Sequence, residues 1–142
     1  MAMGRPTDDL RQPLVFVVDD SLDSIAYLSA ILEKEGYLVR PVFEAEGLFG
    51  RVFEERPALV LCDVNMPGVD GATLSRLLKR SASRTLVVLC SAMPIDELVA
   101  HVARSGADGY VHKAYPPARI ARTINGLIDR RERSSLEPKA LP

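Results

Sequence analysis

The sequence predicts an α/β fold in which five strand–helix units build one parallel sheet with helices on both of its faces. Two observations lead to this prediction. Short, continuous apolar runs recur at intervals of about one strand plus one helix, and segments of helical periodicity fill the gaps between them. Runs that are apolar throughout are typical of strands buried on both faces. Strands that alternate with helices imply a doubly wound sheet with right-handed crossovers.

Five apolar runs are the expected strands. They cover residues 14–18, 37–42, 58–62, 85–90 and 109–112. Pro41 lies in the second run, and proline cannot donate a hydrogen bond to the ladder of a central strand. The second strand is therefore expected at an edge of the sheet, which is its place in the flavodoxin-like strand order 2-1-3-4-5.

Apolar residues that recur every three or four positions predict the first two helices, over 22–35 and 44–55. The first helix places four apolar residues on one face: Ile25, Leu28, Ile31 and Leu32. Gly36 follows it as a C-terminal stop. In the second helix we expect three apolar side chains to be buried together: Leu48, Val52 and Phe53.

The other three helices follow the same rule. Residues 71–80 place three leucines on one face: Leu74, Leu77 and Leu78. The helix over 95–105 has two acids in its first turn, where the helix dipole favours negative charge. The last helix begins near residues 116–117 and aligns four apolar side chains: Ile120, Ile124, Leu127 and Ile128.

The length and composition indicate a single domain. The chain has 142 residues, of which 47% are hydrophobic and 26% charged, and its formal net charge is −1. Domains commonly contain about 100–150 residues. We therefore expect one domain over 13–132, a flexible leader over 1–12 and a flexible tail over 133–142. The near-zero charge argues against direct binding of nucleic acid, and no apolar run approaches the ~20 residues that a membrane span needs.

The two cysteines, Cys62 and Cys90, lie inside apolar runs. This pattern is typical of reduced core residues rather than of a disulfide framework. The polar residues 1–13 contain no hydrophobic signal region, so we expect a cytoplasmic protein. Because both cysteines come directly before residues of the expected site, on strands that we expect to be neighbours, their side chains could face each other. Core packing is the favoured interpretation.

In folds of this class the site lies at the carboxyl ends of the strands. The strands end in Asp19 and Asp20, in Asp63, in Ser91 and near Lys113. Three carboxylates in one crevice repel each other, and a hard divalent cation would relieve that repulsion. Mg²⁺, with Mn²⁺ as a substitute, suits oxygen ligands at a shallow acidic site. The metal and the lysine ammonium together fit the site to an anionic group such as a phosphoryl group.

Asp63 is the candidate nucleophile, because carboxylates form aspartyl-phosphates. Ser91 and Lys113 would contact the phosphoryl oxygens, and the metal would neutralise charge that develops during transfer. The segments around these residues resemble the receiver domain of two-component response regulators, the CheY-like family. The resemblance covers about residues 13–130 and is strongest in four segments: Val17 to Ser21, Leu61 to Gly71, Cys90 to Ala92 and Gly106 to Lys113.

The resemblance implies that Asp63 is the phosphoacceptor and that Lys113 pairs with the phosphate. It further implies that Mg²⁺ is held by Asp19, Asp20, Asp63 and the backbone carbonyl of Asn65. In the family the lysine is usually followed by a proline, whereas Ala114 follows it here. A cis peptide bond before a residue other than proline costs about 2.5–4 kcal/mol. We therefore expect Lys113–Ala114 to be trans and the loop before the last helix to be rebuilt.

The resemblance also assigns the switch and the residues that tune dephosphorylation. Ser91 takes the hydroxyl position that senses the phosphoryl group, and Tyr110 takes the aromatic position that turns inward on activation. Asn65 and Met93 each lie two residues after a site residue, at positions that tune dephosphorylation in the family. An apolar Met93 could obstruct the attacking water and lengthen the phosphorylated lifetime.

The implied function is that of a stand-alone receiver domain, a monomer or weak dimer. It would take a phosphoryl group from a histidine kinase or phosphotransfer protein and then switch the binding of a downstream protein at its fourth helix, fifth strand and fifth helix. It would catalyse only its own phosphorylation and dephosphorylation, so it is not a conventional enzyme. One alternative is an aspartate-nucleophile phosphohydrolase, which would carry a second acid where Asn65 stands. The other is a docking module that is never phosphorylated, whose usual sign is a missing acid or lysine.

Overall fold

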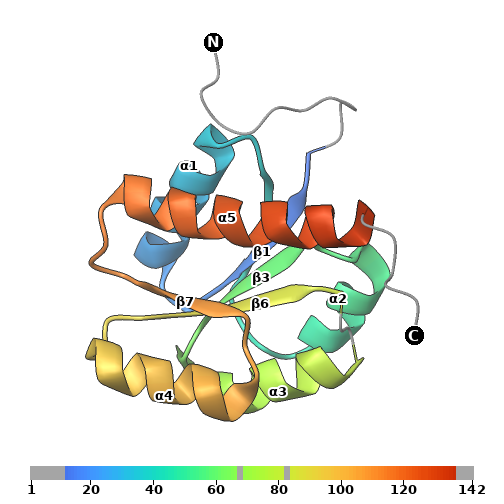
Figure 1. Cartoon of the computed structure of the whole chain (residues 1–142). Coiled ribbons are helices and arrows are strands. Elements are labelled where there is room, and N and C mark those ends of the chain that lie inside the picture. The colour runs from blue at the N-terminus through green and yellow to red at the C-terminus, as the bar shows by residue number, and fades with distance from the viewer. Residues whose placement is uncertain (1–11, 67–68, 82–83, 137–142) are drawn as a thin grey trace.

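The computed structural model describes residues 12–66, 69–81 and 84–136. Figure 1 shows three layers, with α1 and α5 on one face of a central sheet and α2, α3 and α4 on the other. This arrangement confirms the predicted α/β fold with helices on both faces of the sheet. Within the described ranges, no helix is both long enough and apolar enough to cross a bilayer.

The central sheet has five parallel strands in the order β2-β1-β3-β6-β7. Their bounds are Leu14–Val18 (β1), Leu38–Val42 (β2), Leu59–Asp63 (β3), Leu86–Ser91 (β6) and Gly109–His112 (β7). This is the predicted order, because β4 and β5 form a separate pair. The second strand, which contains Pro41, lies at an edge as expected. Strands β3 and β6 are buried along their whole length, which explains their continuous apolar sequences.

Four helices connect strands of the described chain, and a fifth follows the last strand. Their bounds are Leu22–Lys34 (α1), Leu48–Glu55 (α2), Gly71–Ser81 (α3), Ile95–Ser105 (α4) and Pro117–Leu136 (α5). Helix α2 begins at Leu48 rather than at 44, because Gly47 at its start has the left-handed backbone conformation, with φ of 77°. Helix α5 continues to Leu136, so the first residues of the predicted tail over 133–142 are helical. Residues 1–11 of the predicted leader, and 137–142 of the tail, lie outside the described residues.

A short antiparallel pair that the sequence did not predict follows β3. It consists of β4 (Asn65–Met66) and β5 (Val69–Asp70), with Asn65 opposite Asp70 and Met66 opposite Val69. Each of its strands has only two residues, which is too short for a period-two pattern to be recognised. The pair lies between the end of β3 and the start of α3, directly after Asp63.

Alternate residues of each strand point to opposite faces of the sheet. In β1, Val15 and Val17 pack with residues of α1 and α5, whereas Phe16 and Val18 pack with residues of α2 and α3. The sheet is therefore apolar on both faces. In β3 and β6, the polar side chains stand at the carboxyl ends of the strands, as Asp63 and Ser91.

The same alternation settles how the two cysteines are placed. In the register of β3 and β6, Cys62 is opposite Leu89, and Cys90 is opposite Asp63. The two thiols are therefore on opposite faces of the sheet. Cys62 packs on the face covered by α2 and α3, and Cys90 packs on the face covered by α1 and α5. The idea that they face each other is wrong. Both are buried free thiols that pack in the core.

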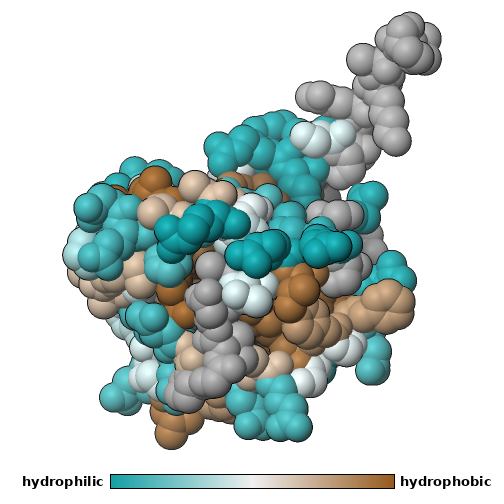
Figure 2. Space-filling view, turned by 90° about the horizontal axis from the view of Figure 1, so that it is seen from below, coloured by the Kyte–Doolittle hydropathy of each residue, from teal (hydrophilic) through white to brown (hydrophobic). Residues whose placement is uncertain are grey.

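The predicted apolar faces of α2 and α3 are partly wrong. Leu48 and Val52 are buried, but Phe53 is 69% exposed and Leu77 is 44% exposed. Phe53 lies about 100° further around the helix than Val52. Its side chain is therefore outside the narrow face of this short helix that packs on the sheet. Figure 2 shows the face covered by α2, α3 and α4, where apolar side chains reach the surface among hydrophilic ones.

Two alanine substitutions on α2 test this assignment. Leu48→Ala should lower the free energy of unfolding by about 2–5 kcal/mol, because a fully buried leucine leaves a cavity. Phe53→Ala should change it by no more than about 0.5 kcal/mol, as substitutions at exposed positions usually do. Denaturant unfolding of both variants measures the difference. Equal losses would show that Phe53 is buried like Leu48.

Candidate functional site

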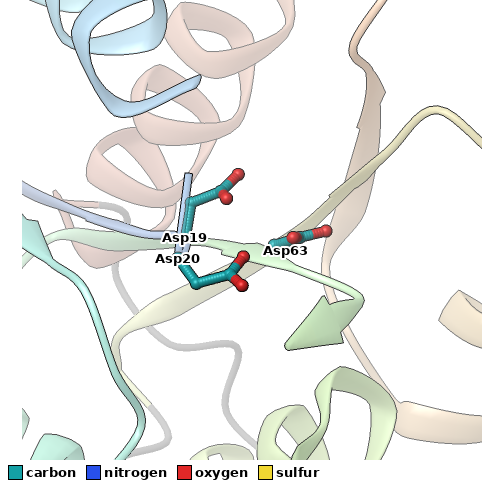
Figure 3. Close-up of side chains that lie close together, drawn as sticks. All are labelled: Asp19, Asp20 and Asp63. Carbon is teal, nitrogen blue, oxygen red and sulfur yellow. The ribbon is translucent and has the colours of Figure 1, made fainter. Parts of the chain in front are cut away.

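Three aspartates meet at the carboxyl ends of two neighbouring strands. Asp19 and Asp20 follow β1, and Asp63 is the last residue of β3. The two strands pair with Val18 opposite Cys62, so Asp19 and Asp63 come next at the same level. Figure 3 shows the three side chains together, and one carboxylate oxygen from each lies within 4.8 Å of the others. The structure thus brings together the three acids that the strand ends predicted.

Backbone amides hold two of these carboxylates. The N–H of Ser21 donates to Asp19 Oδ1 at 2.9 Å, and the N–H of Asn65 donates to Asp63 Oδ1 at 3.2 Å. Ser21 is also the N-cap of α1, and its hydroxyl accepts from the N–H of Ser24 at 3.2 Å. The start of α1 therefore orients Asp19, and the start of the β4–β5 pair orients Asp63.

Lys113 brings a positive charge to the acids from the far edge of the sheet. It follows β7, and its side chain extends past the ends of β6 and β3. Its Nζ lies 2.9 Å from Asp19 Oδ2 and 3.6 Å from Asp63 Oδ2. All peptide bonds within the described residues are trans, including Lys113–Ala114 as expected. The replacement of the usual proline by Ala114 therefore does not keep the ammonium from reaching the acids.

Burial and neighbouring charges shift the pKa values of Asp63 and Lys113. Burial is the main cause that raises the pKa of Asp63, while the charge of Lys113 lowers it, and the charges of Asp19 and Asp20 add to the increase. For Lys113, burial alone would lower the pKa of the ammonium. The contact with Asp19 and the charge of Asp63 outweigh burial, so the pKa of Lys113 is raised. The site therefore favours additional positive charge.

The burial and charge of these acids fit a metal ion. Asp19 is 1% exposed and Asp63 is 7% exposed, whereas Asp20 faces solvent. Asp19 Oδ2 is paired with the Lys113 ammonium at 2.9 Å, and among the described residues no other donor meets this oxygen. One ammonium cannot balance the charge of three carboxylates. Three carboxylates placed in this way suit a hard divalent cation, so this cluster could hold a metal ion.

Ser91 and Tyr110 lie on the strands beyond the acids, and Met93 lies in the loop between β6 and α4. Ser91 ends β6, is buried, and accepts a hydrogen bond from the N–H of Met93 at 3.0 Å. Tyr110 in β7 and Met93 are both half-buried, and both pack against one small cluster: Val64, Leu89 and Leu98. The structure thus links the serine loop to the tyrosine through α4. The roles assigned to these three residues remain predictions.

Sequence reasoning missed Ser24, whose hydroxyl lies 3.5 Å from the Nζ of Lys113. Ser24 is in the first turn of α1, and its N–H bonds the N-cap Ser21. A capping serine directly after Asp19 and Asp20 was the available signal, because it places the first helical turn beside the acids. The sequence gives no comparable signal that Ser24 approaches a lysine so distant along the chain.

Comparison with known proteins relates the whole fold to one family. The family described as "response regulator receiver domain" matches residues 15–125. The chain is 30% identical over 125 residues to the DNA-binding response regulator MtrA of Mycolicibacterium smegmatis, which covers 88% of this chain and 54% of that protein. It is 30% identical over 118 residues to the chemotaxis protein CheY of Bacillus subtilis, which covers 81% of this chain and 97% of that protein.

A solved structure has the same fold. The CheY-like response regulator receiver domain protein of Methanospirillum hungatei JF-1 superposes with a TM-score of 0.79 at 22% identity, over 87% of this chain and 99% of that one. The chain spans about half the length of MtrA, and about half the length of the transcriptional regulatory protein PrrA of Mycobacterium leprae.

The raised pKa of Asp63 predicts the effect of Asp63→Asn on stability. An acid whose pKa is higher in the folded chain stabilises the fold while protonated, and that stabilisation is lost as the pH rises through the folded pKa. At pH ~7 in a metal chelator, Asp63→Asn should therefore raise the free energy of unfolding. The gain should fade toward pH ~3.9, the usual pKa of an unfolded aspartate.

Denaturant unfolding at several pH values measures this change. The matched control is Asp23→Asn, which removes an exposed acid from the first turn of α1 and should bring no gain. A loss of stability in Asp63→Asn at neutral pH would show that attraction to Lys113 outweighs burial of the carboxylate.

Proposed function

The chain belongs to the response regulator receiver domain family, and from that premise we propose that it accepts a phosphoryl group on Asp63 in a Mg²⁺-dependent step. The donor is a histidine kinase or a phosphotransfer protein. One observation carries the proposal most directly: the Asp63 carboxylate ends a buried strand beside two acids able to hold a cation, and lies 3.6 Å from the Lys113 ammonium. Lys113 and a cation held by the acids would together neutralise charge around this nucleophile.

In the proposed transfer, an oxygen of the Asp63 carboxylate forms a bond to phosphorus. The bond from phosphorus to the donor atom breaks, and the donor atom leaves with that electron pair. Lys113 neutralises charge on the phosphoryl oxygens and holds Asp19 in place through its 2.9 Å contact. The N–H of Asn65 keeps Asp63 oriented.

The metal ligands of this proposal are Asp19, Asp20, Asp63 and the backbone carbonyl of Asn65. Bound Mg²⁺, or Mn²⁺ in its place, would supply positive charge for the phosphoryl oxygens. The raised pKa of Asp63 and the closeness of the three carboxylates support this ligand set, because a cation relieves the repulsion among them.

We extend the proposal to a switch that changes partner binding. Ser91 would contact the phosphoryl group, and Tyr110 would change its packing against the cluster that contains Leu98 of α4. A downstream protein would then bind the face formed by α4, β7 and α5. Ile95 and Val99 are exposed on α4 and give this helix apolar surface for a partner. Phosphorylation would act by shifting the population of two conformations.

The other parts of the proposal concern the whole protein. It acts as a phosphoacceptor with autodephosphorylation rather than as a conventional enzyme, in the cytoplasm, and as a monomer or weak dimer. MtrA is a DNA-binding protein by its name, and its match covers about half of that protein. For this chain we keep the prediction that it does not contact nucleic acid directly.

Incubation with acetyl phosphate and Mg²⁺, followed by intact mass measurement, tests the phosphoacceptor. The wild-type chain should gain the mass of one phosphoryl group, and a chelator should prevent the gain. Asp63→Asn should gain nothing, whereas the exposed-site control Asp23→Asn should behave as wild type. An adduct that persists in Asp63→Asn would place the acceptor elsewhere. No adduct from small donors or from a kinase would rule the proposal out, and sustained turnover of a phosphomonoester would favour the phosphohydrolase instead.

Met93 provides a separate test of how the phosphorylated lifetime is set. Met93→Ala should speed autodephosphorylation a few-fold, because it opens a path for the attacking water. The matched control is Val102→Ala, which trims a partly buried side chain of the same cluster and should leave the rate unchanged. Decay of the phosphorylated mass with time measures both rates. Unchanged decay in Met93→Ala would contradict the role of Met93.

A further inference from the structure

Lys113 lies in a tight turn that joins β7 to α5. On its strand side, the N–H of Lys113 donates to the carbonyl of Ser91 at 2.9 Å and extends the β6–β7 ladder by one bond. On the other side, the N–H of Tyr115 donates to the carbonyl of His112 at 3.0 Å and closes the turn. The direction in which the lysine leaves the sheet therefore depends on the conformation of residues 112–115.

The side chain of His112 adds a bond inside this turn. Its Nδ1 accepts from the N–H of Ala114 at 3.0 Å. The imidazole must then be neutral with its proton on Nε2, because a ring nitrogen that carries a proton cannot accept. Proline has no N–H, so this bond is available only because Ala114 occupies the position where the family usually has proline.

The imidazole is in turn held by its neighbours. Its ring centroid lies 5.8 Å from that of Tyr115, with the planes tilted by 40°. The guanidinium of Arg119, in the first turn of α5, lies 3.9 Å from the centroid of the Tyr115 ring. A cation this close to an aromatic face is attracted to it. Contacts between side chains thus run from His112 through Tyr115 to α5 and limit the freedom of the ring.

We propose that His112 is a positioning residue for Lys113. Its bond to the N–H of Ala114 supplies the restraint on the turn that a proline ring would otherwise supply, and so keeps the ammonium directed at Asp19 and Asp63. Without this restraint the turn has more conformations, and fewer of them place Nζ within reach of the acids. When the rate of phosphorylation is the quantity measured, the test of this inference rests on the proposed function.

Two substitutions at His112 separate the hydrogen bond from the bulk of the ring. His112→Phe keeps an aromatic ring against Tyr115 and removes the acceptor. His112→Asn removes the ring and supplies an amide oxygen, which readily accepts from the N–H two residues along the chain. With acetyl phosphate and Mg²⁺, His112→Phe should be phosphorylated about two- to tenfold more slowly than wild type, and His112→Asn at nearly the wild-type rate.

Two backgrounds show whether His112 acts through this bond and through Lys113. In a chain that carries Ala114→Pro the N–H is gone, so adding His112→Phe should slow the reaction no further. In a chain that carries Lys113→Met the ammonium is gone, so adding His112→Phe should again change nothing. If His112→Phe slowed phosphorylation equally in the wild-type, Ala114→Pro and Lys113→Met chains, the proposal would be overturned. A His112→Asn variant as slow as His112→Phe would also overturn it.

A measurement without phosphorylation keeps this inference separate from the proposed function. In the metal-free protein, NMR should show faster amide exchange at Ala114 and a lower order parameter for the Lys113 side chain in His112→Phe, and wild-type values for both in His112→Asn. If the wild-type chain accepts no phosphoryl group, the proposed function fails while this result still decides the role of His112. Unchanged exchange and order in His112→Phe would overturn that role.

Discussion

The contact of one ammonium with two nearly buried carboxylates is the constraint on which the site depends. Asp19 and Asp63 lie at the ends of adjacent strands, where burial and the charge of Asp19 raise the pKa of Asp63. Lys113 offsets this cost from the other side of the sheet. Because β7 lies at the opposite edge of the sheet from β2, the turn after β7 must direct the side chain back over the strand ends.

The apolar sheet makes this contact effective. Both faces of β1 and β3 are covered by helices, so the charges at the strand ends lie next to a medium that screens them poorly. Attraction and repulsion between charged groups are strong in such a place. The arrangement explains why the pKa values of Asp63 and Lys113 move away from their usual values.

Several elements could be predicted because their sequence signals are local and strong. The continuous apolar runs identify the five strands, and Pro41 identifies an edge. Other features depend on packing that no local pattern specifies. Phe53 has the right spacing for the core but lies outside the stripe that α2 buries, and α5 extends to Leu136 through a polar stretch with no stop signal. Whether the two cysteine side chains face each other depends on the register between β3 and β6, which places them on opposite faces of the sheet.

The sequence by itself determined which residues end the strands. Three acids, a serine and a lysine were therefore expected together at the carboxyl end of the sheet. That inference needs only the rule that parallel strands finish on the same side of the sheet. The tertiary structure decided which of these groups touch. Lys113 contacts Asp19 more closely than Asp63, Ser24 approaches the ammonium, and the N–H of Ala114 donates to the His112 ring. These contacts join residues far apart in the chain or depend on side-chain direction, and both are set by how the helices pack on the sheet.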